Sequence, residues 1–261
     1  MNQNSGDWPK ISVVTPSFNQ GRYIEATIRS VLEQDYPNLE YIIMDGGSTD
    51  GTMGIIEKYS DRLDYWVSEK DEGQTDALIK GFDRASGDIL CWLCSDDLFE
   101  ARTLQEVAEI FVRHPDWEVL YGDSFWIDAE GRPLRFKREI PYYRFIWMYD
   151  HNYLPQPSTF WRRGIYEKVG GLDPGMQLSM DADLWSRFAE HTVLHHVPLA
   201  WSRMRFYPEQ KNRRLRAKSD EEDGLIRSRY LPDEALWLRR SKYLLAKSAR
   251  VTLKLARRAY W

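Results

Sequence analysis

Short apolar runs alternate with helical patterns over the first hundred residues of the chain. Four runs rich in β-branched and aliphatic residues are predicted as strands: 11–15, 39–44, 63–67 and 89–93. Apolar residues recur with helical spacing over 22–33 and 73–85. Strands that alternate with helices through short connections pair in parallel and carry helices on both faces of the sheet. The pattern therefore predicts a Rossmann-like α/β sheet.

Polar residues gather where each of these strands ends. They fill 15–19, 45–48, 68–71 and 95–97. The carboxyl ends of parallel strands lie at one edge of a sheet, and the ligands of such sheets bind there. Topology alone thus predicts a binding site at this edge.

The second half of the chain has a mixed pattern. Strands are predicted at 119–128 and 158–161, with a hairpin-like turn at 130–132. The predicted helices are 104–113, 163–169, 181–189, 221–230 and 234–260. We expect residues 1–100 and 101–215 to form the two halves of one mainly parallel, helix-flanked domain. Residues 216–261 are expected to form a C-terminal helical extension.

Composition limits the class of protein. The 261 residues can bury a full core, and 43% hydrophobic with 29% charged residues exclude a disordered or fibrous chain. Apolar runs are too short to span a bilayer, and residues 1–7 lack the parts of a signal peptide. Two cysteines cannot make a disulfide framework, so we expect a cytoplasmic protein. We predict structural roles for Cys91, Cys94 and the pair His195-His196, because the members of each pair would point to opposite faces of a strand.

The formal net charge of −4 hides an asymmetry. Residues 236–261 hold eight of the 36 basic residues and none of the 40 acidic ones. The rest of the chain therefore has 28 basic against 40 acidic residues, a balance of −12. An acidic body argues against nucleic acid as a partner, and a basic end predicts attraction to an anionic surface.

On a helical projection, the basic residues of this end share one face beside an apolar face. The basic face contains Lys247, Arg250, Lys254, Arg257 and Arg258, and the apolar face contains Leu244, Leu245, Val251, Leu255 and Ala259. Such a helix can lie in an anionic membrane interface, where each basic residue contributes about 1 kcal/mol. The alternative is a helix packed on the domain with a solvated basic face. We favour membrane contact.

Two adjacent carboxylates, Asp96 and Asp97, follow directly after the predicted strand 89–93. Carboxylate oxygens at a strand end can hold Mg²⁺ or Mn²⁺, and such ions usually bridge to phosphates. The competing interpretation is that Ser95 or Asp96 caps the next helix.

Two further acidic positions follow other strands. Asp45 can accept a hydrogen bond from a ribose or a base, or it can stabilise the turn at Gly46-Gly47. Asp76 and Lys80 lie four residues apart on one helix face, after a glycine that permits close backbone approach.

The order of these segments resembles that of the family 2 glycosyltransferases, which have the GT-A fold. Six segments carry the resemblance, within residues 11–211: 14–19, 45–52, 71–77, 92–97, 170–173 and 180–185. The resemblance implies transfer of a sugar from a nucleotide diphosphate sugar, with inversion at the anomeric carbon. Uridine diphosphate is the donor nucleotide that it favours. Together with the basic end of the chain, it leads us to expect a lipid-linked sugar or a polysaccharide as the acceptor, at the inner face of the cell membrane.

The resemblance also implies roles for single residues. Asp97 would contact Mn²⁺ or Mg²⁺, and Asp181 would act as the general base that takes the proton of the acceptor hydroxyl. The residues expected to bind the donor are Thr15, Pro16, Phe18, Asn19, Asp45, Asp76, Lys80 and Asp96. Asp183 competes for the role of base, but it lies two residues further along a helix and should point elsewhere. We favour Asp181 and expect Asp183 to support or cap.

The chain departs from the family pattern at two places. Met180 stands where an acid is usual, and Tyr207 stands where a late histidine is common. Tyrosine has an unperturbed pKa of about 10, so Tyr207 is a poor metal ligand and the third protein contact to the cation stays unassigned. Arg205 and Lys211 can still hold phosphate oxygens. Gln156 and Trp185 are expected on the acceptor side.

Two other functions compete with the transferase hypothesis. A sugar nucleotidyltransferase shares a related sheet, but it usually has a Gly-rich loop with a basic residue where this chain reads Thr15-Pro16-Ser17-Phe18-Asn19. A non-catalytic sugar-nucleotide-binding subunit is the alternative that Met180 and Tyr207 keep open. The sequence is also compatible with a homo-oligomer.

Overall fold

The computed structural model describes residues 8–257 and 259. Its first half is a parallel sheet with the strand order β3-β2-β1-β4. The strands are β1 (Ile11–Ser17), β2 (Leu39–Asp45), β3 (Tyr65–Ser68) and β4 (Ile89–Trp92). Helices α1 (Ile24–Leu32), α2 (Thr52–Lys58) and α3 (Gln74–Arg84) connect them. The prediction of this half is confirmed, and each strand begins and ends within two residues of its expected bounds.

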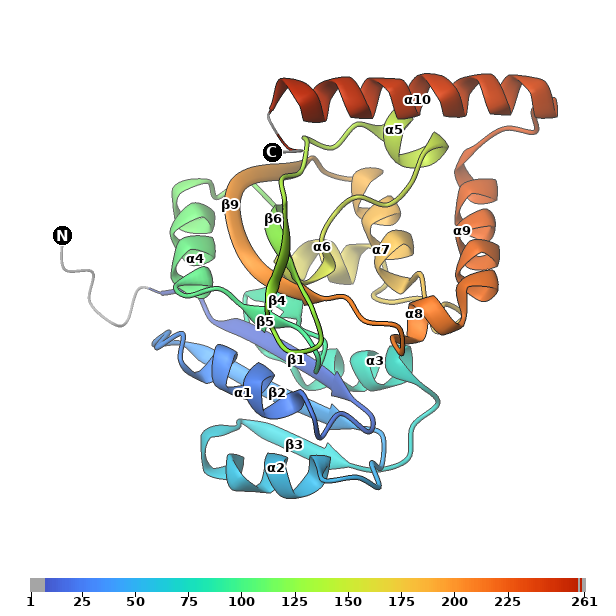
Figure 1. Ribbon diagram of the computed structural model, residues 1–261. Coiled ribbons are helices and arrows are strands. Elements are labelled where there is room, and N and C mark those ends of the chain that lie inside the picture. The colour runs from blue at the N-terminus through green and yellow to red at the C-terminus, as the bar shows by residue number, and fades with distance from the viewer. Residues whose placement is uncertain (1–7, 258, 260–261) are drawn as a thin grey trace.

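The sheet continues without a break into the second half of the chain (Figure 1). Antiparallel pairing joins β4 to β8 (Thr159–Arg162), and β8 to β6 (Val119–Ile127). Strand β9 (Leu194–Arg205) then pairs in parallel with β6, and β5 (Leu98–Phe99) closes the order. The predicted turn at 130–132 is confirmed as a hairpin between β6 and β7 (Pro133–Lys137), with Gly131 at a φ of +84°.

Strand β9 is the main element that the sequence pattern did not predict. Pro198 lies in its middle and cannot donate a hydrogen bond to the sheet. The register against β6 shifts there, from Tyr121 opposite His196 to Asp123 opposite Ala200. This bulge interrupts the alternation of apolar and polar residues that normally identifies a strand.

The remaining helices cover the second half of the sheet. They are α4 (Thr103–Arg113), α5 (Arg144–Tyr149), α6 (Arg163–Lys168), α7 (Met180–Ala189), α8 (Lys211–Arg214), α9 (Arg216–Tyr230) and α10 (Leu236–Ala256), with short 3₁₀ turns at Ser60–Arg62 and Gln156–Ser158. In Figure 1, α7 and α9 lie side by side and α10 crosses one end of the molecule.

A cluster of tryptophans joins α7 to the sheet. Trp92, Trp161 and Trp185 are fully buried, and Trp185 stacks on Trp92 with their ring centroids 5.5 Å apart. Burying rings of this size contributes strongly to stability, so α7 is held firmly against β4 and β8. Most residues in the first half of α7 are therefore buried, and Asp181 is the half-buried exception.

The predicted structural roles of Cys91 and of the paired histidines agree with their surroundings. Cys91 is buried and Cys94 half-buried, and both are free thiols. His195 stacks on Trp117 with ring centroids 3.9 Å apart, while the His196 ring nitrogen Nε2 lies 2.8 Å from Asp123 Oδ1. The two histidines therefore point to different neighbours, as alternation in a strand requires.

Helix α10 is fastened to the domain by ion pairs. Lys254 Nζ lies 2.6 Å from Glu139 Oε2 in a buried pair, and Arg250 binds Asp150. Arg257 bonds His196 at 3.0 Å. The expectation that Arg250 and Lys254 face a surface is therefore wrong, because domain carboxylates hold both. Arg258 lies outside the described residues, and none of the described helices is apolar over a length that would cross a bilayer.

Candidate active site at the carboxyl ends of the strands

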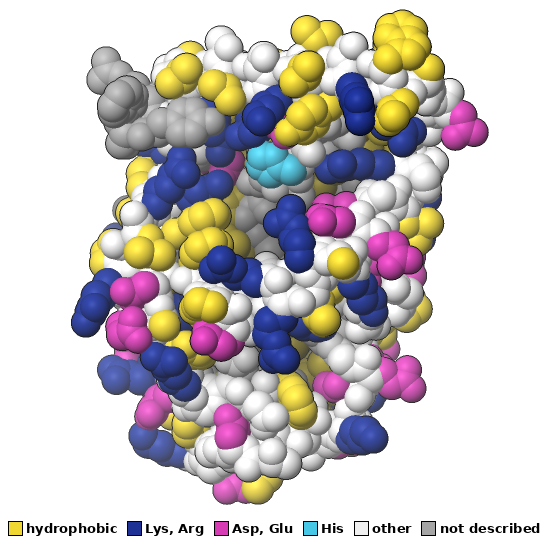
Figure 2. All heavy atoms as spheres, turned by 45° about the vertical axis from the view of Figure 1, so that its right-hand side comes forward, with side chains coloured by type: hydrophobic (Ala, Val, Ile, Leu, Met, Phe, Trp, Pro, Cys, Tyr) yellow, Lys and Arg dark blue, Asp and Glu magenta, His cyan; other side chains and the backbone are white. Residues whose placement is uncertain are grey.

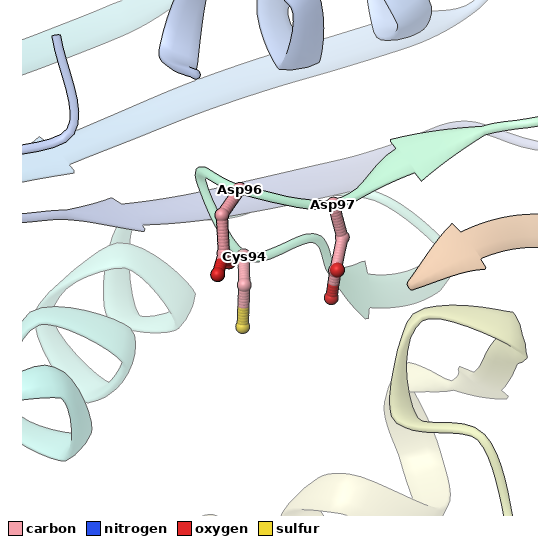
Figure 3. Close-up of side chains that lie close together, drawn as sticks. All are labelled: Cys94, Asp96 and Asp97. Atoms are coloured by element: carbon pink, nitrogen blue, oxygen red, sulfur yellow. The ribbon is translucent and has the colours of Figure 1, made fainter. Parts of the chain in front are cut away.

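The carboxylates of Asp96 and Asp97 follow β4, as the sequence predicts. Together with Cys94 they offer ligand atoms that lie within 4.8 Å of one another, and all three side chains extend to the same side of the loop (Figure 3). Thr27 Oγ1 donates to the backbone carbonyls of Ser95 and Asp97 at 2.9 and 2.8 Å. Helix α1 thereby fixes the loop that carries the two carboxylates.

Each carboxylate uses only part of its hydrogen-bonding capacity within the protein. Asp97 Oδ1 accepts from the Arg205 backbone N–H at 2.8 Å, and Asp96 Oδ2 accepts from the Tyr207 hydroxyl at 2.8 Å. The other oxygen of each makes no hydrogen bond to a described residue. Burial, and then the charge of Asp96, raise the pKa of Asp97 well above its usual range. A divalent cation would offset this repulsion, so these oxygen ligands fit Mg²⁺ or Mn²⁺.

Tyr207 contacts this pair as a hydrogen-bond donor. Its side chain is buried. This burial, and secondly the negative charge of Asp96, raise the pKa of the Tyr207 hydroxyl above its ordinary value of about 10. The phenol is therefore protonated at neutral pH and does not supply a third anionic ligand. Arg205 is also committed, because its guanidinium donates to the carbonyls of Asp128 and Ala129 at 3.3 and 3.0 Å.

The loops after β1 and β2 are bonded to each other. Asp45 accepts from the backbone and hydroxyl of Ser48 at 2.9 and 2.6 Å, and from Ser68 Oγ at 2.6 Å. Ser48 Oγ in turn accepts from the backbone N–H of Asn19 at 2.7 Å. Phe18, beside it, is 59% exposed. Asp45 is thus a turn-stabilising residue here, and the exposed ring of Phe18 is available to a ligand.

The other residues expected on the donor side take different positions. Thr15 and Pro16 are buried in β1, and Thr15 Oγ1 lies 3.1 Å from the Tyr41 hydroxyl. Asp76 and Lys80 form an ion pair of 2.8 Å on α3, and Asp76 also accepts from the Glu72 N–H. The loop before α3 contains Gly73, whose φ of +111° favours glycine.

Asp181 lies in the first turn of α7 and is half-buried. Its Oδ2 accepts from Asn152 Nδ2 at 3.0 Å, and Oδ1 from the Ala182 N–H at 2.8 Å. Burial, with a further contribution from the charge of Asp223, raises the pKa of Asp181 to about 6. A carboxylate with this pKa is ionised at neutral pH yet basic enough to take up a proton.

Cys94 adjoins the acidic pair, and the charge of Asp181 also acts on its thiol. Burial raises the pKa of its thiol, and the charges of Asp97, Asp96 and Asp181 raise it further. Gln74 Nε2 lies 3.3 Å from its sulfur, and Gln156 Oε1 3.5 Å from it. The acidic pair and Asp181 therefore both lie near Cys94, which also contacts Gln156.

Two residues expected on the acceptor side are not available to a ligand. Asp183 is fully buried, and its two oxygens bind Arg187 and Arg229 at 2.7 Å each. Trp185 is fully buried against Trp92. The supporting role expected of Asp183 agrees with these ion pairs. The expectation that Trp185 faces the acceptor is wrong, because the inward face of α7 packs into the core. Lys211 is exposed, and its Nζ donates to the Gln177 carbonyl at 2.9 Å.

Sequence reasoning missed Asn152 and the position of Cys94 in the site. Asn152 comes from the segment after α5, 29 residues from the Asp181 that it bonds, and no local pattern marks it. Cys94 has a signal that could have been used, since it precedes the acidic pair by two residues at the same strand end.

Solved structures share this architecture. A mannosyltransferase from Pyrobaculum calidifontis in complex with GDP-Man and Mn²⁺ superposes with a TM-score of 0.66 and 18% identity, over 94% of this chain and 70% of that one. The S. aureus TarS fragment 1–349 in complex with UDP-GlcNAc superposes with a TM-score of 0.63 and 20% identity, over 77% of this chain and 60% of that one. The protein therefore has the fold of the GT-A glycosyltransferases, as predicted.

The sequence comparison makes the assignment specific. Residues 12–169 match the model of glycosyl transferase family 2, and the chain belongs to this family. The putative teichuronic acid biosynthesis glycosyltransferase TuaG of Bacillus subtilis is 38% identical over 129 residues, which are 48% of this chain and 51% of TuaG. The family resemblance seen in the sequence is confirmed.

Proposed function

We propose that this protein is an inverting, metal-assisted glycosyltransferase that moves a sugar from a nucleotide diphosphate sugar to an acceptor hydroxyl. One observation carries the proposal: Asp181, with a pKa raised to about 6, lies near Cys94, whose sulfur groups with the carboxylate oxygens of Asp96 and Asp97. This transfer needs two functions: stabilisation of the charged leaving group, for which the acidic pair can hold a cation, and removal of the acceptor proton, for which a separate carboxylate is available.

The chemistry is a single displacement. The acceptor oxygen forms a bond to the anomeric carbon while the bond from that carbon to the diphosphate oxygen breaks. Asp181 takes the hydroxyl proton, and its contact with Asn152 keeps the carboxylate oriented. Asp96 and Asp97 would hold Mn²⁺ or Mg²⁺, which neutralises charge on the departing diphosphate. Attack from the face opposite the leaving group inverts the anomeric configuration.

The donor is proposed to lie over the loops after β1, β2 and β4, within residues 1–100. Phe18 is exposed and can cover a base, and Asn19 and Asp45 belong to one hydrogen-bonded unit through Ser48. Lys80, which is half-buried and paired with Asp76, and the exposed Lys211 can supply positive charge to a bound diphosphate. We favour uridine diphosphate, in line with the UDP-GlcNAc bound by the S. aureus TarS fragment.

A screen of sugar nucleotides by thermal shift, with and without Mn²⁺, tests the donor. The correct donor raises the free energy of unfolding by RT ln(1 + [L]/Kd), which is about 2.7 kcal/mol at a hundred times Kd. Transfer to lipid-linked or polysaccharide acceptors is then measured with that donor. Binding without transfer to any acceptor would favour a non-catalytic subunit, and formation of a sugar nucleotide from a nucleoside triphosphate would favour a nucleotidyltransferase.

The pH dependence of kcat/KM checks the role of Asp181. Because burial raises its pKa to about 6, the active ionised form is lost as pH falls through that value. We expect kcat/KM to rise with pH across an apparent pKa near 6. In Asp223→Asn the acid limb should move to lower pH, because a negative charge that raises the pKa of Asp181 is removed. A limb that does not move would contradict this assignment.

The acceptor is proposed to be a lipid-linked sugar or polysaccharide at the inner membrane face, with α10 on the lipid. The contact surface differs from the predicted basic face. The outward side of α10 exposes Trp237, Leu244, Leu245 and Leu255, at 70, 60, 63 and 50%. Arg240 and Lys247 are exposed beside them, and the helix has no acidic residue. Figure 2 has hydrophobic and basic side chains interspersed along the end of the molecule that α10 forms in Figure 1.

Vesicle binding tests this contact. Leu244→Glu combined with Leu245→Glu should lower binding to vesicles with anionic phospholipid by at least about ten-fold, since burying one leucine contributes roughly 1.5–3 kcal/mol. The control is Leu225→Glu, which changes a leucine of similar exposure on α9. Equal binding of both variants and of the wild type would remove α10 from the proposal.

A further inference from the structure

A carboxylate on α9 binds three successive backbone groups ahead of α7. Glu222 Oε1 accepts from the N–H of Gln177 at 3.0 Å, and Oε2 from those of Leu178 and Ser179 at 2.8 Å each. The side chain is buried, with 6% of its surface exposed. Hydrogen bonds to an ionised acceptor are stronger than neutral ones, so Glu222 holds this segment tightly.

The segment that Glu222 binds leads directly into the turn that carries Asp181. Helix α7 begins at Met180, and its N-cap residue Ser179 makes no capping hydrogen bond with its side chain. The C-terminal end of α9 also contacts α7, because Arg229 binds the buried Asp183 at 2.7 Å. Helix α9 thus holds both the residue before α7, Ser179, and the first turn of α7, and the two helices lie side by side in Figure 1.

Met176 and Gln177 also touch the first turn of α3 and the glycine before it. The Thr75 hydroxyl, in that first turn, donates to the Met176 carbonyl. Gln177 Oε1 lies 2.8 Å from the point where a Cβ on Gly73 would stand, so this side chain packs directly on the glycine. Residues 176–179 therefore bridge the loop at Gly73 and the helix that bears the carboxylate Asp181.

We propose that Glu222 is a positioning residue that sets the placement of the general base Asp181 through residues 177–179. The inference rests on the function proposed above. The N–H of Ser179 is buried and those of Gln177 and Leu178 are partly buried, so all three favour a protein acceptor, and a carboxylate can serve them from one side. A glutamine at this position has one oxygen to offer and turns an amide N–H₂ toward backbone donors. The segment would then shift or open, and Asp181 would move with it.

The test compares Glu222→Gln with the wild type and with Glu221→Gln, which makes the same change at the exposed neighbouring residue. Misplacing a reacting group by about 1 Å can cost on the order of 10²-fold in rate. We expect kcat of Glu222→Gln to fall by about that factor, with the Kd of the donor unchanged in a thermal shift titration. Amide hydrogen exchange at 177–179 should accelerate, and Glu221→Gln should match the wild type in every measurement.

A pH profile separates positioning from general loss of structure. Asn152 bonds Asp181, and charge couples Asp181 to Asp223 and Cys94; the variant changes none of these three groups. A displaced Asp181 should have a shifted acid limb of kcat/KM, whereas a smaller population of folded enzyme would lower the rate without moving that limb. If Glu222→Gln does not fold, Glu222→Asp takes its place, because it keeps the charge and shortens the reach.

The outcomes distinguish this inference from the proposed function. If the Glu222 variant keeps the wild-type kcat and the wild-type exchange at 177–179, the inference is overturned. The proposed function still stands in that case, provided that Asp181→Asn lowers transfer. Full activity of Asp181→Asn would instead overturn the assignment of the base, and the exchange data would then report only a structural contact.

Discussion

Asp181→Asn should reduce kcat by about 10²–10⁴-fold, the usual contribution of a positioned general base. Asparagine has nearly the same shape and can still accept from Asn152 or from the Ala182 N–H, but it cannot take a proton at neutral pH. The donor should bind with unchanged affinity, because the carboxylate acts on the acceptor hydroxyl. Steady-state transfer kinetics and a donor titration measure the two effects.

The matched control is Asp220→Asn, which removes one exposed carboxylate from α9. It should keep wild-type kcat. Turnover of Asp181→Asn equal to that of this control would contradict the assignment of the base. A loss of donor affinity together with kcat would indicate that Asp181 belongs to the donor site instead.

Asp97→Asn should abolish the dependence of donor binding on Mn²⁺. Its Oδ1 can still accept from the Arg205 N–H, but the negative charge that would hold the cation is gone. Metal stabilisation of a leaving group contributes several kcal/mol, so kcat/KM should fall by about 10³-fold. Thermal shifts with donor, with and without Mn²⁺, measure the binding effect.

The same substitution should not destabilise the protein without ligand. Burial and Asp96 raise the pKa of Asp97, so its ionised form lowers stability once pH exceeds the pKa of the unfolded chain. Asparagine carries no charge and so avoids this loss of stability at neutral pH. The melting temperature without Mn²⁺ should therefore equal or exceed that of the wild type. Asp83→Asn, an exposed change on α3, is the control for charge alone. A Mn²⁺-dependent donor shift that persists in Asp97→Asn would contradict a metal site there.

The parallel half of the fold was predictable because its signals are local. Each of β1, β2 and β4 is a short apolar run, and a polar cluster marks the carboxyl end of each. The second half depends on pairing between distant segments. Strand β9 contains a proline-centred bulge, and its partner β6 lies about 75 residues earlier, so no window of sequence indicates that they pair.

The site follows the same division. Asp96, Asp97 and Asp181 could be proposed from the sequence because each stands at a strand or helix end within a recognisable segment. Trp185 was misplaced because helical periodicity does not indicate which face of α7 meets the core. Glu222 was missed because its three hydrogen bonds reach 43–45 residues back along the chain. On α10, the buried partners Glu139 and Asp150 decide which basic residues point inward.

The anomeric configuration of the product tests the central claim most directly. With a donor whose sugar is α-linked to the diphosphate, NMR of the freshly formed product reports the configuration at the transferred anomeric carbon. Direct displacement with Asp181 as base predicts a β-linked product and release of the nucleoside diphosphate. An α-linked product would contradict the single displacement and with it the roles assigned to Asp181 and the acidic pair.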